Sequence, residues 1–337
     1  MDRTILSIMI LMLVLATVYA FYHTRHTTVV PLPPPVPTTP VDVALQTITV
    51  GQIKEYVETL SDLNKFDGRG AGTPGNDAAC KYISDIFTSW GYEVELQQFT
   101  FGDRQTNNIM ASIKGKNDDE VVVVGAHYDG QGPNHPSADD NASGTSVVLA
   151  VAKAFTLLNS ELNRTVVFQL YSAEEYGLIG SNYYCQHPLF PKGNPDIKKH
   201  VFMLNMDMVG YWQRMVRFNL LMPNDPTPDV KTLIENLSKK YPFASTITHR
   251  DNAPTDNASF CNAGVPVAYL HTGIHKNYHQ PTDTPEKLNY EGLENIAKYV
   301  VEFLLAVDQA EKPMQLRSDF VPLEIEKDHG EAPFFQL

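Results

Sequence analysis

The stretch Val121-Val-Val-Val-Gly-Ala126, followed at once by His127-Tyr-Asp129, decides the fold of this sequence. A continuous apolar run of this kind is typical of a strand buried on both faces, as in a parallel sheet. Further runs of the same character lie at 165–171, 200–205 and 265–270. Apolar residues at helical spacing lie between Asn76 and Gly91 and near 143–159, 226–240 and 285–308. The alternation predicts an α/β fold with a mixed, mostly parallel central sheet and helices on both faces.

The first forty residues differ from this alternating body. Residues 5–22 form an apolar run of eighteen residues in which only Ser7 and Thr17 are polar. This length suits a retained membrane anchor, and an export signal with a cleavage pattern at Val18-Tyr19-Ala20 fits equally well. Both alternatives predict an extracytoplasmic domain, which is either secreted or periplasmic, or anchored in the cell membrane and facing outward.

A proline-rich stretch follows, with six prolines between Pro31 and Pro40. Such a composition favours an extended, semi-rigid spacer. The chain is therefore expected to divide into a signal peptide or membrane anchor (1–22), a spacer (23–44), a folded domain (45–310) and a peripheral C-terminal tail (311–337).

Composition excludes some classes of partner. The 337 residues include 26 basic and 39 acidic side chains, which gives a net charge of −13. This balance argues against nucleic acid and against electrostatic docking on anionic membranes, because both need clustered basic residues. The three cysteines are too few for a disulfide scaffold. No partner protein is predicted.

Residues that can bind metal follow the apolar runs, at the edge where the carboxyl ends of parallel strands meet. Imidazole and carboxylate ligands without a nearby thiolate are typical of zinc, cobalt or manganese centres. Three carboxylates in one pocket repel each other unless cations neutralise them, so two ions that share one carboxylate fit better than one ion. The candidate ligands are His127, Asp140, Glu175, Asp207 and His279.

Five motifs along the chain carry a family resemblance. They are His127-Tyr-Asp-Gly, Ala138-Asp-Asp-Asn-Ala-Ser-Gly144, Ala173-Glu-Glu-Tyr-Gly177, Asn205-Met-Asp-Met-Val-Gly210 and Tyr278-His-Gln-Pro-Thr-Asp283. In this order they resemble the motifs of the M28 metallopeptidases, the di-zinc aminopeptidases related to leucyl aminopeptidases. The resemblance spans about residues 45–308 and implies a zinc-dependent exopeptidase fold of the phosphorylase/hydrolase-like kind.

The resemblance also implies roles for single residues. It implies two Zn²⁺ ions per chain that Asp140 bridges, through a segment in which the Asp140–Asn141 peptide bond is cis. His127 and Asp207 are then the further ligands of one ion. Glu175 and His279 are those of the other ion, and Glu174 is the general base.

The residues themselves are consistent with these roles. Neighbouring side chains of an extended segment diverge, so Glu175 can bind an ion while Glu174 faces the attacking water and transfers its proton to the leaving amine. Asp129, two residues after His127, is expected to contact the other imidazole nitrogen. Tyr278 either donates a hydrogen bond to the oxyanion of the tetrahedral intermediate or is a packed aromatic side chain.

Other patterns predict less. Gly70-Ala-Gly-Thr-Pro-Gly75 has the spacing of a dinucleotide-binding motif, but it follows a helical segment instead of a strand, so we interpret it as a loop. His271, His275 and His279 are four residues apart, but Gly273 favours a loop, and only His279 is expected to be a ligand. The sequence has neither the G-x-S-x-G nor the H-E-x-x-H motif of serine hydrolases and zincins.

These observations favour an exported zinc-dependent aminopeptidase that hydrolyses peptides with a free N-terminus, because an acidic pocket suits a cationic α-amine. A glutaminyl-peptide cyclotransferase of the same fold, with one metal ion, is the main alternative. A carboxypeptidase-type member of the same family and a catalytically inactive adaptor domain are further alternatives.

Overall fold

The computed structural model describes residues 39–211, 217–219, 228–241 and 254–311. The apolar segment 5–22, the spacer up to residue 38 and the tail from residue 312 lie outside the described residues. The expected anchor or signal, spacer and tail therefore stay predictions. Among the described helices, none has both the length and the apolar character needed to cross a membrane.

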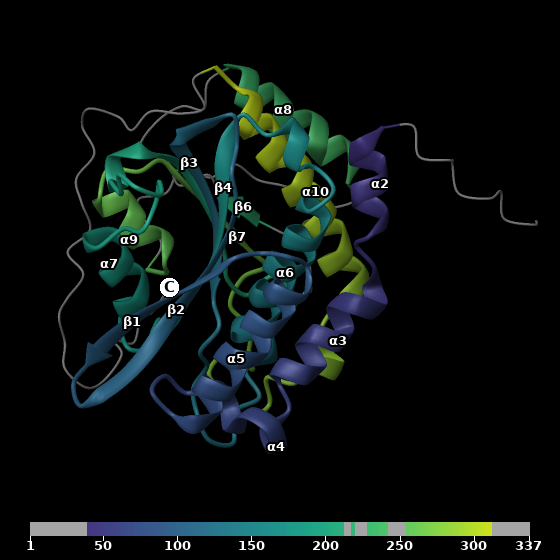
Figure 1. Cartoon of the computed structure of the whole chain (residues 1–337). Helices are drawn as coiled ribbons and strands as arrows, with labels where there is room; N and C mark the ends of the chain where they lie inside the picture. The colour runs from purple at the N-terminus through teal and green to yellow at the C-terminus, as the bar shows by residue number, and fades with distance from the viewer. Residues whose placement is uncertain (1–38, 212–216, 220–227, 242–253, 312–337) are drawn as a thin grey trace, which may run out of the picture. The chain divides into compact units, whose positions relative to one another are not determined.

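A seven-stranded sheet runs through the middle of the described domain (Figure 1). Its strands are β1 (Val94–Phe101), β2 (Arg104–Ile113), β3 (Asn117–His127), β4 (Arg164–Tyr171), β5 (His200–Met206), β6 (Arg217–Asn219) and β7 (Val267–His271), in the spatial order β1-β2-β4-β3-β5-β7-β6. The inner strands β4, β3, β5 and β7 are parallel, whereas β1, β2 and β6 pair antiparallel at the two sides. The four apolar runs are these inner strands, so the predicted mixed sheet with a parallel centre is confirmed.

The β1–β2 hairpin was not predicted from the sequence. Its strands mix polar with apolar residues, such as Gln98 and Thr100 in β1, because part of the hairpin faces water. The hairpin turns at Gly102, whose φ of 57° lies in the left-handed region that glycine adopts without strain. A search for continuous apolar runs therefore passes over it.

Helices cover both faces of the sheet, as expected. Helices α7 and α9 lie on one face, and α3, α5, α6 and α10 lie on the other (Figure 1). The helices are α2 (Pro40–Gln46), α3 (Val50–Leu60), α4 (Leu63–Phe66), α5 (Pro74–Ser89), α6 (Gly144–Phe155), α7 (Ile179–Gln186), α8 (Pro228–Lys240), α9 (Asn257–Asn262) and α10 (Tyr290–Gln309).

The apolar side chains of the strands alternate between two cores. In β3, Val122 and Val124 point into the larger core with α6 and α10. Val121 and Val123 point into the smaller core with α7 and α9. This period of two is the consequence of the pleat, and it explains why a strand covered on both faces has no polar side.

The folded domain begins earlier than residue 45. Helix α2 starts at Pro40, where Thr39 and Asp42 form a reciprocal capping box. Ala44 of this helix is fully buried in the larger core. Residues 40–44, which were expected to belong to the spacer, are therefore part of the domain.

The aromatic centre of the larger core gives a test of the fold. Phe168 of β4 is fully buried between the rings of Tyr92 and Phe155, at centroid distances of 5.7 and 5.6 Å. Phe168→Ala should lower the free energy of unfolding by about 3–5 kcal/mol, through lost burial and the cavity it leaves. The control Leu157→Ala, at a side chain that is 46% exposed, should change it by less than about 0.5 kcal/mol. Urea denaturation measures both, and equal effects would contradict this packing.

Candidate metal centre

The carboxyl ends of the parallel strands lie along one edge of the sheet, and the candidate ligands gather there. The last residue of β3 is a histidine, and an aspartate directly follows β5. Two glutamates follow β4, a histidine lies in the loop after β7, and an aspartate lies in the segment between β3 and α6. These residues are the five candidate ligands His127, Asp140, Glu175, Asp207 and His279, together with Glu174, the expected general base.

A first group of side chains forms around His127. Its Nε2 atom lies 3.3 Å from Oδ1 of Asp140 and 3.3 Å from Oδ1 of Asp207. The carboxylate of Glu174 is further away, at 3.9 Å. His127 is fully buried. The donor atoms of His127, Asp140 and Asp207 lie within 4.8 Å of one another, which is close enough to hold one metal ion.

A second group forms around His279. Its Nε2 atom lies 3.1 Å from Oδ2 of Asp140 and 3.1 Å from Oε2 of Glu175. The donor atoms of these three residues also lie within 4.8 Å of one another. Asp140 therefore offers one oxygen to each group, and the structure brings all five candidate ligands together.

The backbone around Asp140 is held by its neighbour Asn141. The amide of Asn141 donates to the carbonyl of Met206 at 2.9 Å and accepts from the N–H of Gly144 at 2.8 Å. A Cβ atom at Gly144 would lie 2.5 Å from the same carbonyl, so only glycine allows α6 to start this close to β5. The Asp140–Asn141 peptide bond is cis, as the resemblance implies.

Polar residues orient the candidate ligands from behind. Asp129 lies against Nδ1 of His127, with its backbone carbonyl at 3.2 Å and its carboxylate at 3.5 Å, as the sequence predicts. The same carboxylate accepts the backbone N–H groups of Glu174 and Glu175 at 3.2 and 3.4 Å. Asp129 thereby links the ends of β3 and β4.

The expectation that Glu174 and Glu175 lie in an extended segment is wrong. They lie in a tight turn, in which the N–H groups of Gly177 and Leu178 donate to the carbonyl of Glu174 at 2.8 and 2.9 Å. Ala173 before them has a φ of 60°. The two side chains still diverge, because the turn directs Glu174 to the first group and Glu175 to the second.

Tyr278 lies beside the second group. Its ring stacks on His279, with the centroids 3.7 Å apart. Burial, together with the charges of Asp140 and Glu175, raises the pKa of Tyr278 above its ordinary value. The hydroxyl therefore keeps its proton at neutral pH and is available as a hydrogen-bond donor.

The carboxylates hold protons on both histidines. Burial alone lowers the pKa of an imidazole, but Glu174 and Asp207 outweigh it and raise the pKa of His127 well above 6.5. Contacts with Asp140 and Glu175 likewise overcome burial and raise the pKa of His279 to about 10. Without metal, therefore, protons take the place of cations between these side chains.

The pKa values of the carboxyl groups differ with their neighbours. Burial raises the pKa of Glu174 well above 4.5, and burial with the charge of Asp140 raises that of Glu175 to about 7. For Asp140, the two imidazoles outweigh the effect of burial and keep the pKa below its ordinary value.

The donor set fits divalent metal ions. Oε1 of Glu175 is buried and accepts no hydrogen bond from any described residue, and Oδ2 of Asp140 lies 3.1 Å from the imidazole of His279. Buried carboxylate oxygens without a partner are costly unless a cation or a proton completes them. The donors are oxygen and imidazole nitrogen, which suit zinc and similar ions. The three cysteines are buried, and none belongs to either group.

Sequence reasoning missed several residues that support the site. The Thr255 hydroxyl donates to Oδ2 of Asp207 at 2.7 Å. Asp283 accepts the backbone N–H groups of Asp139 and Asp140 at 3.0 Å each. Asp283 ends the last of the five motifs, but nothing in the sequence shows which backbone groups it contacts.

Asp256 is a further buried carboxyl group near the site. Neither of its oxygens has a hydrogen-bond partner among the described residues, and burial raises its pKa to about 7. It was not predicted either, because it lies in a segment without a metal-ligand pattern.

The other expected patterns have structural roles. His271 ends β7, whereas His275 and His279 lie in the loop after it, as the glycine predicts. Of the motif 70–75, the first four residues form a loop, and Pro74 is the first residue of α5. The motif follows a helical turn instead of a strand, which argues against a dinucleotide site.

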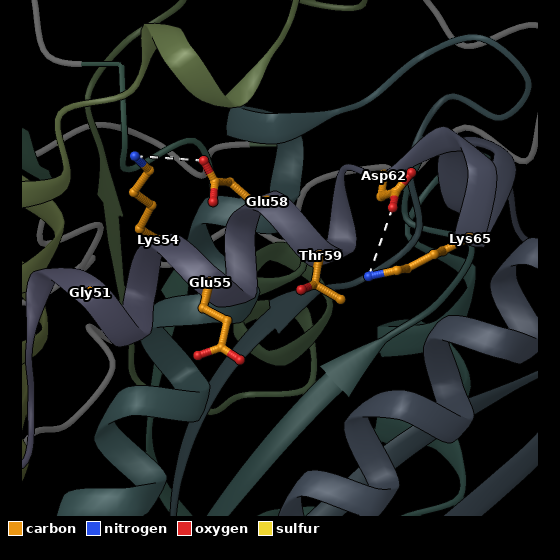
Figure 2. Close-up of a pocket in the computed structure, with 7 residues that line it drawn as sticks. All are labelled: Gly51, Lys54, Glu55, Glu58, Thr59, Asp62 and Lys65. Carbon is orange, nitrogen blue, oxygen red and sulfur yellow. Dashed lines mark ion pairs between the residues drawn. The ribbon is translucent and has the colours of Figure 1, made fainter.

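Figure 2 shows a surface hollow along α3 and the turn after it. Four of its five charged side chains form ion pairs, Lys54 with Glu58 at 3.7 Å and Lys65 with Asp62 at 3.8 Å. None of the candidate ligands lines this hollow. It is therefore a solvated helix surface and plays no part in the candidate centre.

Comparison with known proteins points in the same direction. The family described as peptidase family M28 matches residues 108–304, more than half of the chain. A probable leucine aminopeptidase of Arthroderma benhamiae is 31% identical over 275 residues, which cover 77% of this chain and 73% of the relative. Leucine aminopeptidase 2 of Trichophyton rubrum is 29% identical and is matched over 68% of this chain. The chain spans about half the length, 50%, of that relative.

Solved structures share the fold. BSAP, a zinc aminopeptidase from Bacillus subtilis, superimposes with a TM-score of 0.66 over 80% of this chain and 98% of its own, at 17% identity. The glutaminyl cyclase of Porphyromonas gingivalis superimposes with a TM-score of 0.64 over 77% and 98%, at 18% identity. At these identities the likeness concerns the fold alone.

The Thr255 contact generates a prediction about metal affinity. Thr255→Val keeps the shape of the side chain but removes the hydroxyl that orients Asp207. The affinity for one zinc ion should fall about 10–100-fold, as when other outer contacts of metal ligands are removed. The control Thr156→Val loses a hydroxyl bonded to a helix carbonyl and should bind zinc like wild type. Competition with a chromophoric chelator measures both; equal affinities would contradict the role of Thr255.

The raised pKa values generate a prediction about pH. In metal-free protein, the pKa is raised to about 7 for Glu175 and to about 10 for His279. The folded chain then binds more protons than the unfolded chain, so the free energy of unfolding falls as pH rises. For Glu175 this fall extends from the ordinary pKa of 4.5 to about 7, and for His279 it extends from 6.5 to about 10. The lowered pKa of Asp140 acts only at acidic pH and does not change this sign.

The melting temperature of chelator-treated protein should therefore decrease from about pH 6 to about pH 9. Excess zinc should weaken this decrease, because ions replace the protons. Thermal unfolding across this range, with chelator and with zinc, measures the effect. A melting temperature of the metal-free protein that rises with pH would show that the histidines are not held protonated.

Proposed function

This chain belongs to peptidase family M28, and from this premise we propose that it is a zinc-dependent aminopeptidase that removes N-terminal residues from peptides. The observation that carries the proposal is the position of Asp140, which offers Oδ1 to the His127 group and Oδ2 to the His279 group. Two such groups that share one carboxylate suit two metal ions better than one. The names of the leucine aminopeptidases that the chain resembles support the choice of activity.

Under this proposal His127, Asp140 and Asp207 hold one Zn²⁺ ion, and Asp140, Glu175 and His279 hold the other. When bound, two such ions lower the pKa of a water molecule and neutralise charge that develops on the substrate carbonyl oxygen. The zinc aminopeptidase of Bacillus subtilis, which shares the fold, supports zinc as the metal.

Glu174 is the general base of the proposal. Its side chain is 11% exposed, and its carboxylate lies 3.9 Å from Nε2 of His127 in the first group. This distance is longer than those from the same nitrogen to Asp140 and Asp207. The raised pKa of the carboxyl group favours a base that takes a proton from the attacking water and then delivers it to the leaving amine. The same group can do both, because the carboxyl group that has taken up the proton of the water can then donate it.

Tyr278 acts on the substrate in this proposal. The protonated hydroxyl of Tyr278 donates a hydrogen bond to the oxyanion of the tetrahedral intermediate. Peptides with a free N-terminus are the proposed substrates, and the names of the leucine aminopeptidases that the chain resembles support this choice. We also propose that the protein acts outside the cytoplasm, and the apolar segment 5–22 supports this.

A glutaminyl cyclase of similar fold makes cyclisation of N-terminal glutamine the second candidate. Purified, zinc-supplemented protein should release p-nitroaniline from unblocked aminoacyl p-nitroanilides, lose activity with a chelator and recover with zinc. N-acetylated substrates should not react. Formation of pyroglutamate from glutaminyl peptides, with one zinc ion per chain, would favour the cyclase instead, and activity on blocked substrates alone would exclude an aminopeptidase.

Glu174→Gln tests the proposed base. Because the amide cannot take up the proton, kcat should fall about 10²–10⁴-fold. The zinc content should stay that of wild type, since Glu174 is not a proposed ligand. The control Glu55→Gln changes an exposed side chain of α3 (Figure 2) and should leave kcat unchanged. Steady-state kinetics with elemental analysis decides, and a wild-type kcat in Glu174→Gln would refute the mechanism.

A further inference from the structure

His275 has no role in the proposed function. It lies in the loop between β7 and α10, four residues before His279. Its Nε2 atom lies 3.0 Å from Oδ2 of Asp139, and the two side chains are only 4% and 0% exposed. His275 belongs to neither of the two groups around the metal centre.

The contacts of the His275 ring fix its tautomer. The backbone N–H of Asn277 donates to Nδ1 at 3.2 Å, so this nitrogen carries no proton. Nε2 therefore carries the proton and donates it to Asp139. The face of the ring stacks on Tyr211, with the centroids 4.0 Å apart. Both nitrogens and one face of the imidazole thus have defined partners.

Asp139 connects the loops that carry the proposed ligands. Its Oδ1 atom accepts the backbone N–H of Gly210, at 2.7 Å, in the segment that follows Asp207. Its Oδ2 atom accepts from His275 in the loop after β7. The residue after Asp139 is Asp140 itself. One buried carboxylate therefore joins the segments after β3, β5 and β7.

A second contact attaches the loop after β7 to the backbone of Asp139 and Asp140. The carboxylate of Asp283 accepts the N–H groups of Asp139 and Asp140 at 3.0 Å each. His279 lies midway between His275 and Asp283 in the sequence, four residues from each. The proposed ligand thus sits between two anchors, and both lead to the segment of Asp140.

The two groups depend on such anchors to different degrees. His127 ends a central strand and is fully buried, so the sheet itself fixes its place. The side chain of His279 is 29% exposed and lies in a loop, with a φ of 54°. Its position relative to Asp140 and Glu175 therefore depends on what holds the loop.

We propose that His275 is a positioning residue that fixes, through Asp139, the loop carrying Tyr278 and His279, and thereby sets the affinity of the second group for its metal ion. The inference rests on the proposed function, because it takes Asp140, Glu175 and His279 as zinc ligands. His275 itself touches neither ion nor substrate.

His275→Phe tests this inference in the full chain. The variant keeps a ring to stack on Tyr211 but cannot donate to Asp139 or accept from Asn277. Zinc titration against a chromophoric chelator should show that one of two ions binds about 10–100-fold more weakly while the other is unchanged. His275→Gln retains an N–H at the position of Nε2 and should restore most of this affinity.

Two further variants separate positioning from general destabilisation. His200→Phe is the matched control, because this histidine is also buried, its Nε2 atom lies 2.8 Å from the hydroxyl of Tyr184, and it belongs to neither group; it should bind zinc like wild type. His279→Ala removes the second group, and in that background His275→Phe should no longer change zinc affinity. The inference would be overturned if His275→Phe weakened the binding of both zinc ions. It would also be overturned if His275→Phe still changed zinc affinity in the His279→Ala background.

The outcome for wild type distinguishes the two proposals. If wild type binds only one zinc ion, the proposed function fails, and the inference fails with it. If wild type binds two ions and His275→Phe binds both with unchanged affinity, only the inference fails. Thermal unfolding of the metal-free variants provides a readout that does not depend on activity. If His275 acts by positioning, the difference in zinc affinity between His275→Phe and His275→Gln should be larger than the difference between their melting temperatures explains.

Discussion

The mutual repulsion of carboxylates in one buried pocket is the constraint on which the rest of the structure depends. Asp140, Glu174, Glu175 and Asp207 are each at most 11% exposed in their side chains, and they share two imidazoles. Like charges this close are unfavourable unless opposite charge lies between them.

Part of the opposite charge is permanent, because it comes from the guanidinium of Arg69. This side chain is fully buried and donates to the backbone carbonyls of Tyr128 and Ser137 at 2.9 and 2.8 Å. Nearby acidic groups, including Asp129 and Asp283, attract this guanidinium and partly offset the lowering of its pKa by burial. The remaining opposite charge comes from protons on the histidines or, as proposed, from metal ions.

The scaffold keeps these groups together by placing them at the ends of strands. The parallel ladder between β3 and its neighbours β4 and β5 fixes the ends of three strands relative to each other before any side chain contributes. The segment between β3 and α6 has no such ladder, and hydrogen bonds of Asn141, Asp139 and Asp283 replace it. The backbone ladder thus holds His127, whereas His279 lies in a loop that side-chain hydrogen bonds attach to the segment of Asp140.

The sequence predicted the parts of this arrangement that follow from continuous local patterns. The four inner strands are apolar on both faces, so they were recognised, and the polar residue after each strand end could be placed at one edge from topology alone. The β1–β2 hairpin was not predicted, because its strands mix polar and apolar residues. The turn at Glu174 escaped because it depends on a positive φ at Ala173, which no residue type signals. The contacts of Thr255 and Asp283 with the site were not predicted for a different reason. Each reaches a partner 48 or more residues away, and only the tertiary fold decides which partner that is.

Charge balance explains why the number of ions matters more to this pocket than the identity of the metal. Four ionised carboxylates carry four negative charges, and two divalent ions carry four positive charges. With one ion, either the His127 group or the His279 group would keep a buried carboxylate without a cation, and the pKa of about 7 for Glu175 shows how strongly burial resists that charge. Such a pocket would have to retain protons on its ligands, or replace a carboxylate by a neutral residue. Here all four acids are present and converge, and the shared Asp140 can be fully used only when both of its oxygens have a cation. The acidic residues of this edge are therefore best understood as one set, whose charge matches the two ions that we propose.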